Sequence, residues 1–222
     1  MEGLRSRIER NLEEVRNRIR AAAERSGRDP GSVRLVAVTK TVGVEEARIL
    51  VGLGVTDLGE NRIDGAREKI EAIGRGARWH MIGNVQRRKA RDVAELFDTV
   101  DSVDRVEVGE ALAQRCEEQG RELEVLLEVN VSGEESKHGF TPENVADAVR
   151  QMAQWRNLHV RGLMTMAPFV EDAEEVRPVF ARLRRLAGEI GLAEVSMGMT
   201  NDFEVAVEEG ATQVRIGSAL FE

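Results

Sequence analysis

Residues 33–40 read Val-Arg-Leu-Val-Ala-Val-Thr-Lys, and this stretch decides the fold. Five of its eight residues are apolar and three are Val, a composition typical of a strand buried on both faces of a parallel sheet. The stretch ends at Lys40, where the predicted strand leaves the protein interior and reaches the opening of a site. Partial burial there favours the neutral amine, which can form a Schiff base with a carbonyl. The alternative is a lysine that simply extends to solvent.

Outward from this strand, the chain alternates between short apolar runs and amphipathic segments. An amphipathic helix is predicted over 3–26, before the first strand. The other predicted strands are 55–58, 78–82, 99–103, 122–131, 159–164, 195–197 and 213–216. The helices predicted between them are 43–53, 62–73, 85–97, 105–119, 141–155, 173–190 and 202–209.

This strict alternation predicts an α/β fold with a parallel sheet. About eight repeats of the unit in 222 residues match a lean (β/α)8 barrel of the TIM type. We therefore expect one domain over residues 1–222, with the extra N-terminal helix filling the place of the helix missing after the last strand. An open, doubly wound sheet is the alternative.

Composition excludes several classes of function. A net charge of −8 argues against a general nucleic-acid binder, and no apolar run approaches the roughly 20 residues that span a bilayer. The single Cys116 and an N-terminus without a signal-type apolar core fit a cytoplasmic protein. Three His and one Cys show no metal-ligand spacing, so no metal is expected. No additional apolar face is evident, which favours a monomer.

Active sites of such barrels lie at the carboxyl ends of the strands. The loops 196–201 and 215–218, after the last two strands, combine Gly with hydroxyl residues, as phosphate-binding loops do. The alternative is ordinary turn and cap chemistry. With Lys40, they predict a ligand that carries a phosphate and a carbonyl. The side chains expected at the strand ends are Lys40, Asn61, His80, Ser102, Asn130, Thr165, Ser196 and Arg215.

Arg215 interrupts an apolar strand and therefore needs a partner. A carboxylate would give a simple salt bridge. A ligand ring nitrogen is the other option, and there a permanent cation would weaken a pyridine ring as an electron sink.

An ordered set of motifs resembles the pyridoxal 5′-phosphate (PLP) homeostasis proteins, single-domain relatives of the barrel half of alanine racemase. These motifs are Ala37-Val38-Thr39-Lys40, Gly59-Glu60-Asn61, Trp79-His80-Met81-Ile82-Gly83, Val129-Asn130-Val131-Ser132-Gly133-Glu134-Glu135-Ser136-Lys137, Gly162-Leu163-Met164-Thr165-Met166, Ser196-Met197-Gly198-Met199-Thr200 and Val214-Arg215-Ile216-Gly217. The resemblance implies that Lys40 carries PLP as an internal aldimine, Arg215 faces the pyridine nitrogen and Asn61 lies near the ring. It places Ser196, Gly198, Thr200, Gly217 and Ser218 around the phosphate and assigns no catalytic residue.

Three positions depart from the family pattern. Residues 63–65 read Ile-Asp-Gly where a Gln-Glu pair is usual, and 86–89 read Gln-Arg-Arg-Lys where Gln-x-Asn-Lys is usual. Thr200 replaces a commoner Ser and keeps the hydroxyl. These changes affect local loops rather than the cofactor.

The resemblance implies a PLP-binding carrier or regulator in intracellular PLP homeostasis, with PLP-dependent apo-enzymes as candidate recipients. The absence of Tyr supports this, since alanine racemase uses a Tyr base. A racemase-like PLP enzyme with Lys40 as sole base is the alternative, and a Schiff-base aldolase that acts on a sugar phosphate without PLP is a third. Lys137 is expected to be an ordinary exposed lysine or a transient second holder of PLP.

Overall fold

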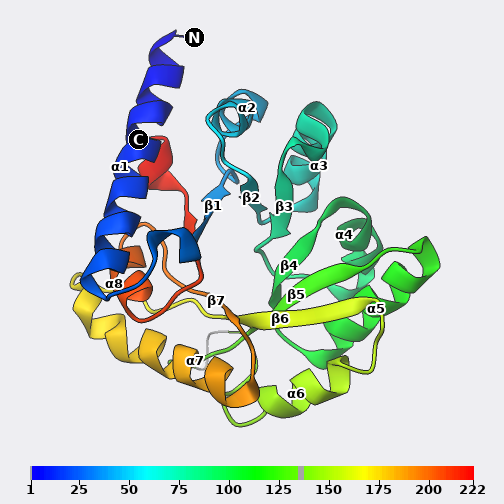
Figure 1. Ribbon diagram of the computed structural model, residues 1–222. Coiled ribbons are helices and arrows are strands. Elements are labelled where there is room, and N and C mark those ends of the chain that lie inside the picture. Colours follow the sequence, from blue (N-terminus) through cyan, green and yellow to red (C-terminus); the bar gives the residue numbers. More distant parts are fainter. Residues whose placement is uncertain (1, 135–137) are drawn as a thin grey trace.

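The computed structural model describes residues 2–134 and 138–222. Eight parallel strands follow one another around a closed barrel, and β8 pairs with β1 to complete it (Figure 1). This confirms the predicted α/β barrel and rules out the open sheet. The strands are β1 (Arg34–Val38), β2 (Asp57–Glu60), β3 (Arg78–Met81), β4 (Thr99–Val103), β5 (Leu123–Glu128), β6 (Leu158–Met164), β7 (Glu194–Ser196) and β8 (Gln213–Ile216).

Helices alternate with the strands and form the outer layer of the barrel. They are α1 (Glu2–Arg25), α2 (Val44–Gly52), α3 (Ile63–Ile73), α4 (Ala90–Leu96), α5 (Val106–Gln119), α6 (Val145–Met152), α7 (Arg177–Ile190) and α8 (Phe203–Glu208). Short 3-10 turns are η1 (Pro30–Ser32), η2 (Gly74–Gly76), η3 (Arg87–Lys89), η4 (Ala173–Val176) and η5 (Ser218–Leu220). Within the described residues, no helix is both long and apolar enough to cross a bilayer.

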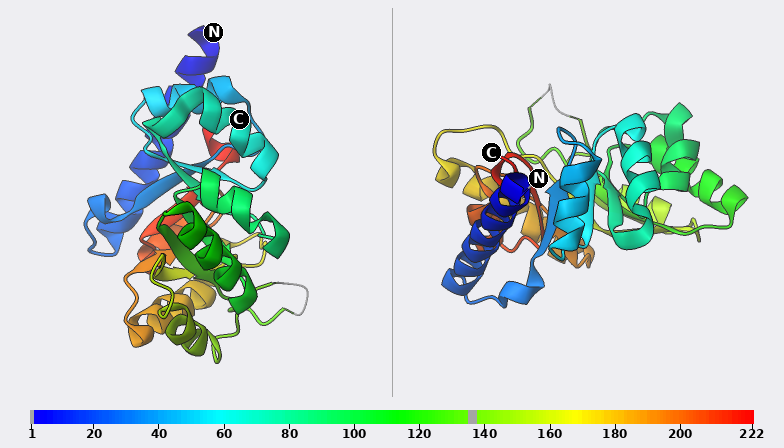
Figure 2. Two further views of the ribbon diagram at one scale, coloured as in Figure 1. Left: turned by 90° about the vertical axis from the view of Figure 1, so that its right-hand side faces the viewer. Right: turned by 90° about the horizontal axis from the view of Figure 1, so that it is seen from above.

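The N-terminal helix α1 fills the gap that the sequence predicts in the outer ring. It lies against α8 and η5 on one side and α2 on the other (Figures 1 and 2). The Arg18 guanidinium pairs with Glu204 at 2.8 Å and stacks 4.7 Å from the Phe203 ring centre, and Arg25 pairs with Glu208 at 2.7 Å. Its apolar face, which includes Ile8 and Leu12, is buried in the core.

Several element boundaries differ from the prediction, among them those of β5 (predicted 122–131), α6 (predicted 141–155), β2 and α4. Strand β2 extends through Gly59 and Glu60 because its register with β3 continues to the pair Glu60 and Met81. Helix α4 begins at Ala90, since the segment before it forms the 3-10 turn η3 and Gln86 supplies no side-chain cap.

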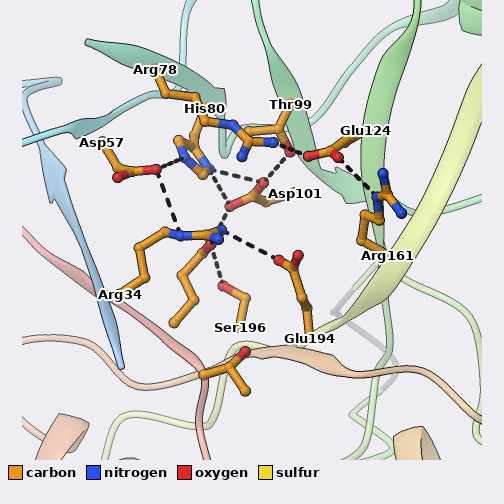
Figure 3. Close-up of polar contacts among 12 residues, drawn as sticks. Arg34, Asp57, Arg78, His80, Thr99, Asp101, Glu124, Arg161, Glu194 and Ser196 are labelled. Carbon is orange, nitrogen blue, oxygen red and sulfur yellow. Dashed lines mark hydrogen bonds and ion pairs between the residues drawn. The ribbon is translucent and has the colours of Figure 1, made fainter. Parts of the chain in front are cut away.

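A charged cluster occupies the inside of the barrel (Figure 3). His80 lies between two carboxylates, with Nε2 3.0 Å from Asp57 and Nδ1 3.1 Å from Asp101. Burial lowers the pKa of His80, but Asp101 and Asp57 outweigh burial and raise it to about 9. Burial in turn raises the pKa of Asp57 and of Asp101, yet the His80 cation outweighs it and holds both below their ordinary values. Gln213 and Thr99 donate further hydrogen bonds to Asp101.

This cluster corrects one prediction. His80 does not stand at the mouth of the barrel but is buried within it, because β3 directs alternate side chains to opposite faces. Trp79 packs in the core outside the barrel, and His80 points inward. The inward charge is tolerated because both ring nitrogens have carboxylate partners.

The packing of β6 on β7 generates a prediction about Gly162. A Cβ at this position would lie 1.9 Å from the Glu194 carbonyl oxygen, so Gly162→Ala forces the two strands apart. We expect it to lower the free energy of unfolding by about 3 kcal/mol, measured by urea denaturation. Gly188→Ala is the control: no atom lies within 4 Å in the interior of α7, and alanine there should add about 1 kcal/mol. Equal midpoints for the two variants would contradict the packing.

The His80 cluster predicts a pH dependence of stability. The pKa of His80 is about 9 in the folded chain and near 6.5 in the unfolded chain, so its contribution is complete below pH ~6.5 and is lost as the pH rises through 9. Wild-type protein should lose about 3 kcal/mol of unfolding free energy over this window. His80→Gln should lack this slope, whereas His159→Gln, which changes a histidine near the surface, should keep it. A His80→Gln slope equal to that of wild type would refute the assignment.

Candidate functional site

A cavity of about 590 Å³ opens at the carboxyl ends of the strands, within the size range of small-molecule sites. Lys40 lines it after β1, Asn61 after β2, Asn84 after β3 and Arg215 within β8. Val38, Ile82 and the loop residues Pro168 and Phe169 supply apolar wall. The cavity therefore combines an apolar lining with a few polar groups from different strands.

Six of the eight predicted site residues lie on this wall: Lys40, Asn61, Thr200, Arg215, Gly217 and Ser218. Ser196 is buried behind it, where its hydroxyl accepts hydrogen bonds from Arg215 at 2.7 Å and Gln213 at 3.0 Å. Gly198 is not among the lining residues and lies against helix α8. Of the other strand-end residues, Ser102 is buried and donates to the Gly83 carbonyl at 2.6 Å rather than lining the mouth, and Asn130 and Thr165 are also absent from the wall.

The backbone that leads to Lys40 is anchored by a buried ion pair. Lys69 Nζ donates to the carbonyl oxygen of Thr39 and to Glu60 Oε1, each at 2.6 Å. The Thr39 hydroxyl donates to the same Glu60 oxygen, also at 2.6 Å. The prediction of a partly buried Lys40 is wrong: the residue is exposed, because it follows the last residue of β1 by two positions and lies on the turn beyond the sheet. The backbone that precedes Lys40 is therefore held in place, whereas the side chain of Lys40 is exposed to solvent.

The two glycine-bearing loops meet at the cavity. Ser218 Oγ donates to Thr200 Oγ1 across 3.3 Å, which joins the loops after β7 and β8. Gly198 has a φ of +92°, and a Cβ there would lie 2.6 Å from the Ala206 Cβ of α8. Only glycine combines this conformation with so close a helix. The loop is further held by Asp202, whose carboxylate accepts from the Met199 amide at 2.6 Å.

Arg215 is 4% exposed and is held by uncharged oxygens. Its guanidinium donates to Ser196 Oγ at 2.7 Å and to the Thr165 carbonyl at 3.0 Å. Among the described residues no carboxylate forms an ion pair with it, so the simple salt bridge that the sequence left open is not formed. Burial lowers the pKa of Arg215, and the more distant charges of Asp101 and Asp202 counteract burial. A guanidinium remains charged under these conditions, so the cavity contains a fixed cation.

Comparison with known proteins gives one consistent answer. The model of the family described as alanine racemase, N-terminal domain, matches residues 10–222. A relative from Pseudomonas aeruginosa, called "Pyridoxal phosphate homeostasis protein", is 42% identical over 225 residues, which covers 97% of this chain and 95% of the relative. The chain belongs to the family described as alanine racemase, N-terminal domain.

Solved structures agree with the family. A protein of unknown function from Bifidobacterium adolescentis has a TM-score of 0.93 at 34% identity and covers 100% of this chain and 97% of that one. PipY of Synechococcus elongatus, described as having PLP bound, has a TM-score of 0.84 at 32% identity and covers 97% of this chain and 100% of that one.

Two residues near the site, Lys69 and Glu128, were not predicted from the sequence. Lys69 reads as an ordinary charged position of an amphipathic helix, and only the fold shows that it turns inward. Glu128 ends β5, is 6% exposed and lines the cavity. An acidic residue that ends a long apolar strand was a usable signal for Glu128.

Within the described part of the chain, no group of three or more His, Cys, Asp or Glu side chains is arranged to hold a metal. Lys137 lies outside the described residues.

The ion pair beneath Lys40 generates a stability prediction for the family member. Lys69→Met leaves Glu60 buried without its cation, and we expect a loss of about 3 kcal/mol in unfolding free energy. Adding Glu60→Gln removes the stranded charge and should restore part of the loss. Urea denaturation of the two single variants and the double variant measures the coupling. Additive losses in the double variant would contradict a direct pair.

Proposed function

We propose that this chain binds PLP in the cavity and acts in PLP homeostasis as an intracellular carrier or regulator. The observation that carries the proposal is the convergence of an amine, a buried cation and two joined hydroxyl-bearing loops on one cavity. The relative named for PLP homeostasis and PipY with PLP bound support the same ligand. We treat the barrel as a single functional domain.

The wall residues fit the parts of the cofactor. Thr200, Ser218 and the backbone at Gly217 and Gly198 would hold the phosphate, since hydroxyl and amide donors suit an anion. Lys40 would hold the aldehyde end covalently, and Asn61 would lie near the ring. Arg215 would face the ring nitrogen, with Ser196 acting through Arg215 as its hydrogen-bond acceptor. When bound, PLP supplies a reversible covalent link to amines and an electron-withdrawing ring.

The placement of Asn61 depends on a close backbone contact. A Cβ at Gly83 would lie 2.4 Å from the Asn61 carbonyl oxygen, so the loops after β2 and β3 touch. Both residues line the cavity. This contact restrains the Asn61 backbone and supports the proposal that Asn61 lies near the ring.

Three features favour a carrier over an enzyme. Lys40 is exposed, so water reaches the amine. The chain contains no Tyr that could act as a second base. Arg215 is a permanent cation, and a cation at the ring nitrogen disfavours protonation of the ring and weakens its ability to stabilise a carbanion. We further propose that the protein works as a monomer in the cytoplasm and hands PLP to apo-enzymes.

Addition of PLP to the purified protein tests the proposal. We expect a yellow product whose visible absorbance is lost on borohydride reduction, with the reduced label on Lys40 by peptide mass mapping. Lys40→Ala should lose the visible band, because the amine that forms the Schiff base is gone. Lys89→Ala, which removes an exposed lysine from η3, is the matched control and should bind as wild type does.

Three outcomes would change the assignment. Wild-type protein that stays colourless with PLP would refute the proposed function. Label found on Lys137 in the wild type would move the attachment point away from Lys40. Steady racemisation of L-alanine by wild-type protein, absent from Lys40→Ala, would favour the enzyme.

A further inference from the structure

Glu128 carries a carboxyl group that lines the cavity and has no partner among the described residues. It ends β5, is 6% exposed and lines the same wall as Lys40 and Arg215. Across residues 2–134 and 138–222, its carboxyl group makes neither a hydrogen bond nor an ion pair. A buried carboxylate without a partner is costly, so this group favours a ligand that can supply a donor or a cation.

Of the two charges that act on Glu128, the negative charge of Asp104 outweighs the positive charge of Arg215. Burial, and then the charge of Asp104, raises the pKa of the Glu128 carboxyl to about 7, whereas Arg215 acts in the opposite direction. Asp104 is itself 7% exposed, and its Oδ1 is buried without a hydrogen bond. Its Oδ2 accepts from Asn84, another wall residue, at 2.9 Å, and from Arg105 at 2.7 Å. Among the described residues, this side of the cavity therefore offers the Glu128 carboxyl group no hydrogen-bond donor.

The loops after β7 and β8, in contrast, offer groups that suit an anion. There Thr200 and Ser218 present hydroxyls to the cavity, and Arg215 contributes a cation. A ligand that satisfies both regions carries an anion at one end and a donor-rich cation elsewhere. A primary ammonium group fits Glu128, since it has three donors and no acceptor.

Resting on the proposed function, we propose that Glu128 forms an ammonium subsite, through which the cavity also binds phosphorylated pyridines that carry a primary amine in place of the aldehyde. Such a ligand cannot form a Schiff base with Lys40, so its affinity comes from non-covalent contacts alone. Because no covalent bond holds this end of the ligand at Lys40, the ligand would turn within the cavity so that its ammonium group pairs with the Glu128 carboxylate while the hydroxyl-bearing loops hold the phosphate. Glu128 would then decide whether the site accepts the aminated form of the cofactor.

Two probes isolate this interaction. Pyridoxamine 5′-phosphate carries the ammonium group, and pyridoxine 5′-phosphate carries a hydroxyl at the same position. Neither has an aldehyde, and both share the phosphate. The ratio of their dissociation constants, measured by isothermal titration calorimetry near pH 8, reports the contribution of the ammonium. We expect wild type to bind the amine about tenfold more tightly than the alcohol, as a charge-assisted hydrogen bond would give.

Glu128→Gln should bring this ratio close to one, because the amide keeps the shape and loses the charge. Glu124→Gln is the matched control: it removes a carboxylate from the same strand at the opposite end of the barrel and should keep the wild-type ratio. Circular dichroism and urea denaturation verify that each variant folds.

A measurement on the wild type alone gives an independent test. Lowering the pH from about 8 to about 6 protonates Glu128, so the preference for the amine should fall towards one. The two probes share the phosphate, so its titration cancels in the ratio. Asp104 and Arg215 act on Glu128 directly, and the other charged or titratable groups on the wall are Lys40, His138, Asp202 and Glu222.

Equal affinities for the amine and the alcohol in wild type near pH 8 would overturn the subsite, as would an unchanged preference in folded Glu128→Gln. Either result, together with normal PLP binding, would leave the proposed function intact. Failure of PLP and of both probes to bind would refute the proposed function and this inference with it.

Discussion

The pairing of β8 with β1 is the constraint on which the rest of the structure depends. Its register places Ala37 beside Ile216, so the turn that carries Lys40 and the turn that carries Gly217 lie at neighbouring strand ends. The position of a Cβ on Gly217 would be 3.5 Å from the Val38 carbonyl oxygen, which shows how closely the two ends approach. Without this closure, the amine near the start of the chain and the hydroxyl loops near its end would share no cavity.

Closure also creates an interior in which most buried charges are paired, with Arg215 and Glu128 as exceptions among the described residues. His80 lies between Asp57 and Asp101, and Lys69 is paired with Glu60 beside the backbone of Thr39. Each of these groups is almost fully buried, and each has a partner of opposite charge. Glu128 breaks this pattern at the mouth, where a ligand rather than the protein can supply the partner. The paired charges stabilise the barrel, whereas the carboxylate of Glu128 is available to bind a ligand.

The sequence predicted the barrel well because the evidence for it is repetitive. Every strand and helix repeats one pattern, so an error at one boundary, such as the start of α4, leaves the topology unchanged. The two loops around Thr200 and Ser218 were also predictable, since glycine and hydroxyl residues after the last strands have few other reasons to recur.

Side-chain direction was not predictable. In strands buried on both faces, apolar residues occupy both sides, so the pattern around His80 does not show which side points inward. The exposure of Lys40 and the inward turn of Lys69 likewise depend on how far each lies beyond an element, which only the folded backbone determines.

The seam between β1 and β8 has a consequence for synthesis. Ribosomes release β1 before the other strands and β8 after them, so every contact along this seam joins segments far apart in the chain. Until β8 emerges, β1 presents an unpaired edge of Val and Ala to the surroundings. Helix α1 also stays partly uncovered until late in translation, because α8 and η5, which pack against it, lie close to β8 in the sequence. The edge of β1 therefore stays unpaired on this side until β8 is made, and its burial coincides with completion of the barrel.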